Sequence, residues 1–217
     1  MSKVTAVESQ KKNPKRFNVF LDGVFAFGAD EDLVVGQRLV VGKAFTTSDV
    51  ERLLFESEVG KLMERMYALF NIRQRSEQEV RRYLKNLSFK RKIKDQEEIS
   101  ESAIELLINK LKQKRLLSDA EFAKAWMESR AKKYGVNRIK QELYKKGIDR
   151  QLIEEVISGE RMENSEQVAR KLLEKKLERW KSLTPMELKK KAFDFLLRRG
   201  FEYSQVKSII ENILKKG

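Results

Sequence analysis

The side chains of this sequence best suited to chemistry are lysines and arginines near the ends of its predicted helices. Such cations bind phosphates or carboxylates, and neutralised phosphates supply most of the non-specific affinity for nucleic acid. For any single residue, a solvated helix face with cations favoured by the helix dipole is the simpler interpretation. As a set, they predict a face that binds an anionic partner, comprising Arg73, Arg75, Arg81, Arg82, Lys85, Arg130, Lys132, Lys133, Lys140, Lys145, Lys146, Arg198 and Arg199.

Most catalytic chemistry is excluded by composition, because the 217 residues include no Cys and no His. This removes thiolate nucleophiles, imidazole acid–base catalysis and zinc sites built from Cys and His. No Gly-rich phosphate loop of the Walker type is present either. The sequence therefore predicts a binding protein that is not an enzyme and that needs no cofactor.

Two groups of neighbouring carboxylates, Asp30 to Asp32 and Glu97 with Glu98, have the residue types that could bind a divalent cation. Carboxylates this close in sequence are typical of a solvated turn or of a first helical turn. No metal site is therefore predicted.

The net charge of +14 is unevenly distributed along the chain. Through Glu58 there are 8 basic and 9 acidic residues, which leaves 39 basic and 24 acidic residues from Val59 onward, a net charge of +15. A one-sided positive field raises encounter rates with polyanions, whether nucleic acids or acidic protein surfaces. The longest apolar run, Met66 to Phe70, is too short to span a membrane, and Met1 to Gln10 is unlike a signal peptide, so a cytoplasmic protein is expected.

Strands are predicted before residue 28. Val4 to Val7 is interpreted as an edge strand, and Lys11 to Arg16 as a polar loop. Apolar residues alternate from Phe17 to Leu21, and Asp22-Gly23 then predicts a hairpin turn, because both positions tolerate positive φ. A three-stranded meander is marginal alone, so it is expected to pack on the acidic 30–35 segment or on the helix that follows.

Helical periodicity begins at Ser48 and continues to the end, with roughly ten helices expected. The stripes include 59–70, 80–87, 104–111, 122–126, 168–180 and 206–214. Capping boxes are predicted where Ser76, Ser118 and Thr184 are each followed three residues later by Glu. Trp126 and Trp180 lie on apolar stripes and are interpreted as core residues, although aromatic side chains can also stack on nucleobases.

A repeated phrase ends two of these helices. Leu143 to Ile148 and Leu196 to Phe201 share an apolar anchor, a basic pair, a Gly suited to the left-handed position and a final apolar residue. They lie 53 residues apart, and a degenerate copy without the Gly is predicted at Leu84, followed by a polar connection over 88–99. Gly135, Gly147 and Gly200 are interpreted as helix-terminating residues. Gly147→Val is therefore expected to reduce stability.

The period indicates a mostly α-helical protein of tandem three-helix repeats, forming an elongated and curved array with a small N-terminal β-meander. The predicted parts are a β-meander with a short helix (1–47), a linker helix with the first repeat (48–116), the second repeat (117–160) and the third repeat (161–217). Arrays of this kind expose large surfaces that bind other macromolecules.

Several spaced motifs resemble the RecX family, regulators of the bacterial recombinase RecA. The central repeat of that family is similar to Leu116 to Ala123, followed by Arg130, Gly135, Arg138-Ile139, Glu142-Leu143 and Lys145 to Ile148. The first repeat is similar to Arg73, Arg75, Ser76, Glu79 and Leu84, and the last to Arg198 to Phe201. The hairpin from Phe17 to Gly23 resembles the leader of Gram-positive members, so the resemblance covers nearly the whole chain.

The resemblance implies a non-catalytic regulator, acting in DNA repair, recombination and the SOS response. Such a protein lies in the groove of the RecA filament on single-stranded DNA, as a monomer, and modulates ATP hydrolysis, strand exchange and coprotease activity, usually by inhibiting them. One alternative is a protein that binds nucleic acid directly, and another is a carboxylate–metal nuclease. Weak direct binding to DNA is also compatible with a regulator of RecA. Replacing Lys145, Lys146, Arg198 and Arg199 with Ala is expected to weaken inhibition with little change in melting temperature.

Overall fold

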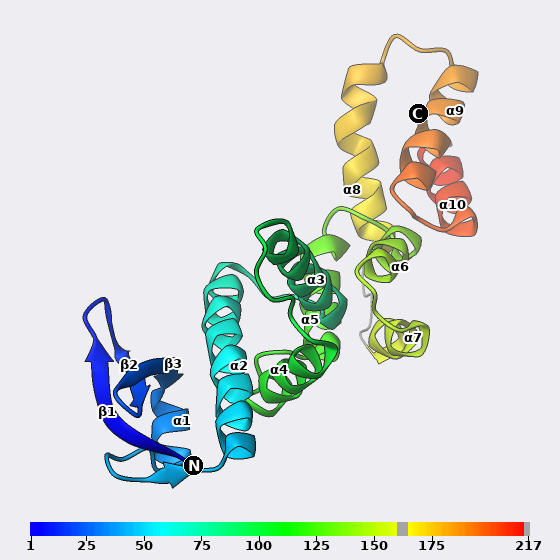
Figure 1. Ribbon diagram of the computed structural model, residues 1–217. Coiled ribbons are helices and arrows are strands. Elements are labelled where there is room, and N and C mark those ends of the chain that lie inside the picture. Colours follow the sequence, from blue (N-terminus) through cyan, green and yellow to red (C-terminus); the bar gives the residue numbers. More distant parts are fainter. Residues whose placement is uncertain (160–164, 215–217) are drawn as a thin grey trace. The chain divides into compact units, whose positions relative to one another are not determined.

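The structure is a computed structural model that describes residues 1–159 and 165–214, without the side chain of Leu214. The chain forms two compact units, the first made of Met1–Gln74 and Arg81–Leu117, the second of Arg75–Val80 and the chain from Ser118 onward. Figure 1 shows a small N-terminal sheet followed by helices, which confirms the predicted mostly helical fold class. The boundary predicted between residues 160 and 161 lies outside the described residues, and the four-part division stays a prediction.

The sheet is antiparallel with strand order β3-β2-β1-β4, where β1 is Ser2–Gln10, β2 is Asn13–Leu21, β3 is Val24–Asp30 and β4 is Ala44–Phe45. The hairpin predicted at Asp22-Gly23 is confirmed, with φ of 49° and 86° at these two residues. Both values suit a tight turn whose twist matches that of the flanking strands.

Two details of the predicted meander are wrong. The segment from Lys11 to Arg16 is not a loop, because only two residues turn and β2 begins at Asn13. A register shift between Ser9 and Gln10 accommodates Pro14, since a bulge tolerates a residue that cannot donate to the ladder. β1 is not an edge strand either, because it also pairs with β4, a strand too short to show a periodic pattern.

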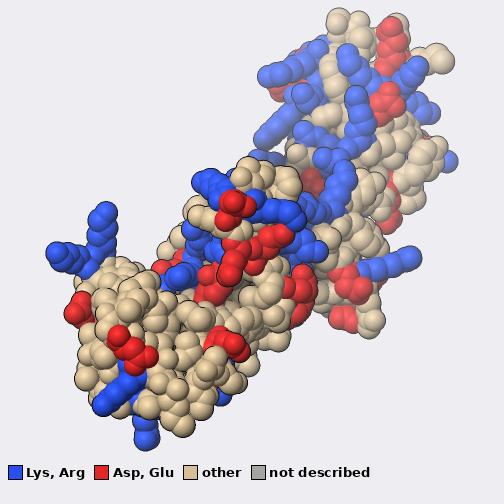
Figure 2. Space-filling model, in the orientation of Figure 1, with Lys and Arg blue, Asp and Glu red and all other residues tan. Residues whose placement is uncertain are grey.

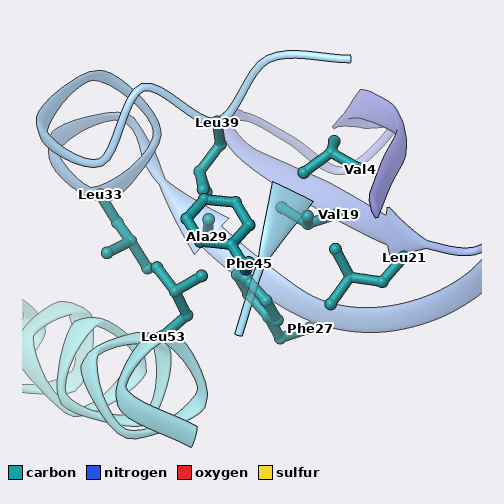
Figure 3. Close-up of a cluster of buried hydrophobic side chains, with 9 residues drawn as sticks. All are labelled: Val4, Val19, Leu21, Phe27, Ala29, Leu33, Leu39, Phe45 and Leu53. Atoms are coloured by element: carbon teal, nitrogen blue, oxygen red, sulfur yellow. The ribbon is translucent and has the colours of Figure 1, made fainter. Parts of the chain in front are cut away.

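The core of the sheet region lies between the strands and two helices, α1 (Glu31–Gly36) and α2 (Thr47–Ile72). Figure 3 shows Leu33 of α1 and Leu53 of α2 pointing toward the apolar face of the sheet, as predicted. Asp30 caps α1, and its neighbours Glu31 and Asp32 occupy the first helical turn. This placement confirms the structural interpretation of the acidic cluster, whose charges favour a helix N-terminus.

Helices α3 (Glu77–Ile93) and α4 (Glu101–Gln113) complete the first unit, although the division between the units falls inside α3. The predicted polar connection over 88–99 is wrong, because α3 continues without interruption to Ile93. The degenerate phrase after Leu84 has no Gly to stop the helix, and Asp95 adopts the positive φ of 56° beyond its end. Within the described residues, no helix is both long and apolar enough to cross a membrane.

The second unit contains two three-helix groups, each with its own core. Helices α5 (Asp119–Ala131), α6 (Val136–Lys145) and α7 (Arg150–Gly159) enclose one cluster around Ile139 and Leu143. Helices α8 (Ser165–Leu177), α9 (Pro185–Arg198) and α10 (Tyr203–Leu214) enclose the other around Leu173 and Leu196. A single 3₁₀ turn, η1 (Glu178–Trp180), follows α8.

The predicted capping box of α9 is complete, with Thr184 accepting from the Glu187 backbone and the Glu187 carboxylate accepting from the Thr184 backbone and hydroxyl. Ser76 and Ser118 also accept from the backbone N–H three residues later. A box that was not predicted, formed by Thr46 and Asp49, begins α2.

The capping box of α9 gives a prediction for the pKa of Glu187. Hydrogen bonds from Thr184 lower this pKa, so the box stabilises α9 above the carboxyl's unfolded pKa and is lost as pH falls through the folded one. We expect Thr184→Ala to raise the Glu187 pKa toward its ordinary value in an NMR titration. Asp49, whose pKa is lowered mainly by hydrogen bonds from Thr46, is the internal control, and its pKa should not change. An unchanged Glu187 pKa in the variant would contradict the assigned cause.

Candidate partner-binding surface

The repeated phrase ends α6 and α9 with the same backbone conformation. Gly147 has a φ of +79° and Gly200 a φ of +81°, and both follow the last residue of the helix cap. The next residue folds back in each case, because Ile148 N–H donates to Leu143 and Phe201 N–H donates to Leu196. The prediction that these two glycines terminate helices is therefore confirmed.

Gly200 also touches the start of α6, so the second and third repeats join through backbone atoms. The N–H of Gly135 donates to the Arg199 carbonyl (2.9 Å), and the N–H of Asn137 donates to the Gly200 carbonyl (3.1 Å). A Cβ at Gly200 would collide with the backbone of Arg138. The interpretation of Gly135 as a helix-terminating residue is wrong: it is the N-cap of α6, where a Cβ would strike the Gly200 carbonyl.

The end of α6 meets the start of α3 in the same way, within the second unit. The Ser76 hydroxyl donates to the Lys146 carbonyl (2.6 Å), and Lys146 Nζ lies 2.5 Å from the Glu79 carboxylate. A Cβ at Gly147 would collide with the side chain of Gln78. At each junction, carbonyls at the C-terminus of one helix therefore accept hydrogen bonds from donors at the N-terminus of another. These bonds satisfy carbonyls that a helix end otherwise leaves unpaired.

A polar network surrounds Trp126, which is partly buried against the core of the second repeat. Its Nε1 donates to Glu142 (3.1 Å), and the same carboxylate accepts from Nε of Arg130 (2.9 Å) and of Arg138 (3.1 Å). The cations of Lys146 and Arg130 lie 4.6 and 5.0 Å from the Trp126 ring. Cation–π contacts and charge-assisted hydrogen bonds thus connect α5 with α6.

Several cations of the predicted face are used inside the protein. Their partners are Glu105 for Arg81, Glu142 for Arg130, Glu154 for Lys140, Glu79 for Lys146, and the Lys133 carbonyl for Arg199. Arg199 also lies over the rings of Phe195 and Tyr134. These side chains hold helices together, which reduces what they can offer to a partner.

The other predicted cations differ in how far they are exposed. In the first unit, Arg73 donates to the Gln74 carbonyl, while Arg82 and Lys85 are exposed on α3 without a hydrogen bond or ion pair among the described residues. In the second unit, Arg75 is half-buried, and its buried Nε has no hydrogen-bond partner among the described residues, while the Arg198 Nε donates to the Asp194 backbone carbonyl. Three other predicted cations of the second unit are exposed and have no side-chain hydrogen bond or ion pair within residues 1–159 and 165–214: Lys132, Lys133 and Lys145.

The third repeat carries cations that the predicted set omitted. Figure 2 shows Lys and Arg gathered over α8 and α9. Exposed lysines and arginines there include Lys171, Lys175, Arg179, Lys181, Lys189 and Lys190. The run Lys189 to Lys191 is visible in the sequence, but it lies outside the repeated phrase. Nearby, Trp180 is partly buried and stacks edge-on against Phe195, so it packs on the core of this repeat.

A hollow of about 340 Å³ lies at the junction of the second and third repeats, which we call the junction hollow. It is lined by Asn137, Arg138 and Gln141 of α6, Leu197 and Arg198 of α9, and Tyr203 of α10. Figure 1 shows these three helices side by side in the second unit. Among the described residues, no group of Asp and Glu is arranged to hold a metal ion.

Comparison with known proteins matches three parts of the chain to sequence models of one family. Residues 2–46 match the regulatory protein RecX N-terminal domain, residues 118–157 the second three-helix domain of RecX, and residues 164–210 the third. These spans coincide with the sheet region and with the two helical groups of the second unit.

Whole-chain relatives agree with these matches. The chain is 33% identical to the regulatory protein RecX of Bacillus subtilis over 212 residues, covering 97% of this chain and 76% of the relative. It is 28% identical to that of Clostridium perfringens strain SM101, covering 98% and 97%. A crystal structure of regulatory protein RecX has the same fold, with a TM-score of 0.75 at 23% identity, covering 97% of this chain and 100% of the other. The chain therefore belongs to the RecX family of regulatory proteins.

Proposed function

We propose that this protein is a non-catalytic regulator that binds the RecA filament on single-stranded DNA. It lies in the filament groove as a cytoplasmic monomer and inhibits ATP hydrolysis, strand exchange and coprotease activity. The observation that carries the proposal is membership of the RecX family over nearly the full chain. Relatives carry the name of regulatory proteins, which supports a role through binding.

The distribution of charge supports an anionic target. The net charge of +15 belongs to the helical part of the chain, and exposed cations without internal partners occur in the second and third repeats. The backbone junctions hold these two repeats in a fixed register within their unit. A basic, multi-repeat surface with a fixed backbone register suits a partner that is itself extended and repetitive, because less backbone has to be ordered on binding.

The proposal is tested with the DNA-dependent ATPase of the cognate RecA. Adding the protein at stoichiometric amounts should lower the hydrolysis rate and shorten filaments seen by electron microscopy. The same titration without RecA measures binding to bare single-stranded DNA over a range of salt concentrations, since phosphate contacts weaken steeply with salt. An unchanged ATPase rate and unchanged filament length would refute regulation of RecA. Firm, strongly salt-dependent binding to bare DNA would favour direct nucleic-acid binding.

Two pairs of substitutions separate binding cations from structural ones. Lys145 and Arg198 are exposed, whereas Lys146 and Arg199 contact Glu79 and the Lys133 carbonyl. We expect the first pair replaced by Ala to weaken ATPase inhibition several-fold with the melting temperature within about 1–2 °C of the wild type, as for ordinary surface changes. The second pair replaced by Ala should lower the melting temperature, because Lys146 and Arg199 each bind another helix or its connection. Equal melting temperatures for the two double variants would contradict this division.

A further inference from the structure

The junction hollow combines two guanidinium groups with an apolar wall. Arg138 and Arg198 both line it, and no Asp or Glu does. Each uses its Nε internally, Arg138 toward the Glu142 carboxylate and Arg198 toward the Asp194 carbonyl. Their terminal nitrogens make no hydrogen bond with other described residues. Two planar forks of donors with fixed stems are thus available to an anion from outside.

Besides the polar Asn137 and Gln141, the hollow has an apolar wall that a phosphate backbone does not need. Leu197 is 39% exposed and Tyr203 is 63% exposed, although both are large apolar or aromatic side chains. Arg and Tyr beside an apolar contact are typical of the energetically dominant centre of a protein–protein interface. Phosphate tracking would be served better by the lysines that are exposed on α8 and α9. The charge and the apolar wall together favour a protein partner.

The same arrangement of an exposed large side chain followed by an exposed cation occurs in the other copy of the repeated phrase. Tyr144 and Lys145 stand in α6 where Leu197 and Arg198 stand in α9, since the two phrases are 53 residues apart. Tyr144 is 44% exposed and Lys145 is exposed, so an uncovered large side chain again precedes an uncovered cation. Core packing explains neither pair, because in each a large side chain is left exposed three residues before the half-buried junction glycine.

We propose that the junction hollow is a docking site for an acidic side chain, flanked by an apolar one, on a protomer of the recombinase. Arg138 and Arg198 bind the carboxylate through paired N–H donors, and Leu197 and Tyr203 receive the apolar neighbour. This assignment rests on the proposed function and adds to it the chemistry of one contact. Paired donation to a carboxylate requires the planar guanidinium, which a lysine of equal charge does not supply.

Arg198→Lys keeps the charge and removes the fork, and Leu197→Ser removes the apolar wall. Arg179→Lys is the matched control, because Arg179 is exposed in the same repeat, lies outside the hollow, and has no hydrogen bond or ion pair among the described residues. Affinity for immobilised RecA filaments and for bare single-stranded DNA is measured for each full-length variant, together with its melting temperature.

We expect Arg198→Lys and Leu197→Ser each to weaken filament binding by about tenfold, the effect typical of a dominant interface residue. Arg179→Lys should bind the filament as the wild type does. Affinity for bare DNA should stay within about twofold in all variants, because every variant keeps the total charge. Wild-type affinity of Arg198→Lys for the filament would overturn the carboxylate clamp. An equal loss on filament and on bare DNA would overturn the protein target in favour of phosphate. If the wild type itself does not bind the filament, the proposed function fails first and the docking site fails with it.

Discussion

Gly200→Val is expected to lower the free energy of unfolding of the second unit by about 3 kcal/mol, through backbone strain and steric overlap together. Gly200 has a φ of +81°, which a β-branched residue resists, and its Cβ would meet the backbone of Arg138. Urea denaturation followed by tryptophan fluorescence measures the change, because Trp126 and Trp180 both lie in the second unit.

Gly159→Val serves as the control, since Gly159 has no positive φ and a Cβ there would meet no atom of the described residues within 4 Å. The two junctions should also differ from each other. A Cβ at Gly147 meets the Gln78 side chain, whose Cδ and Oε1 can move although its Cβ cannot, whereas a Cβ at Gly200 meets the Arg138 backbone N and Cα as well as its Cβ. Gly200→Ala should therefore cost more stability than Gly147→Ala. Equal denaturation midpoints for Gly200→Val and Gly159→Val would show that the junction is not as described.

Glu142→Ala is expected to cost about 2–4 kcal/mol, because it leaves three donors without their acceptor in a partly buried place. The Glu142 side chain is only 13% exposed and accepts from Trp126, Arg130 and Arg138. The loss should appear in the same urea denaturation, together with a changed Trp126 emission in the native state.

Glu155→Ala is the matched control, since Glu155 is exposed and accepts a side-chain hydrogen bond from Gln151 one turn earlier. Its expected effect is within about 0.5 kcal/mol, the range of surface changes. Glu142→Gln keeps an acceptor and loses the charge, so it should fall between the two. If Glu142→Ala were as stable as Glu155→Ala, the network around Trp126 would contribute nothing to the fold.

The predicted partner-binding face is where sequence and structure differ most. The spacing of Lys145-Lys146 and Arg198-Arg199 indicates four equivalent cations, but Lys146 and Arg199 turn inward to other helices. Arg138 lies in the junction hollow although it was not in the predicted set. An exposed cation and one held by a distant carboxylate have the same sequence pattern, because the partner is separated by as many as 67 residues.

What the sequence determined by itself depends on neighbours along the chain. The Asp22-Gly23 turn, the Thr184 capping box and the positive φ of Gly147 follow from backbone sterics and hydrogen bonds within a few residues. The family followed as well, because motifs in order along the chain carry it.

Only the tertiary structure decided the features that join distant segments. Gly135 became a contact for Gly200, Arg16 became a buried residue bound to the Gly28 carbonyl, and α3 continued past its predicted end. For Gly135 and Arg16, the contacts that determine the structure come from another strand or helix. For α3, no helix-terminating Gly is present. The local sequence pattern does not predict either outcome. The docking chemistry at the junction of two repeats has the same origin, since the hollow exists only where α6, α9 and α10 meet.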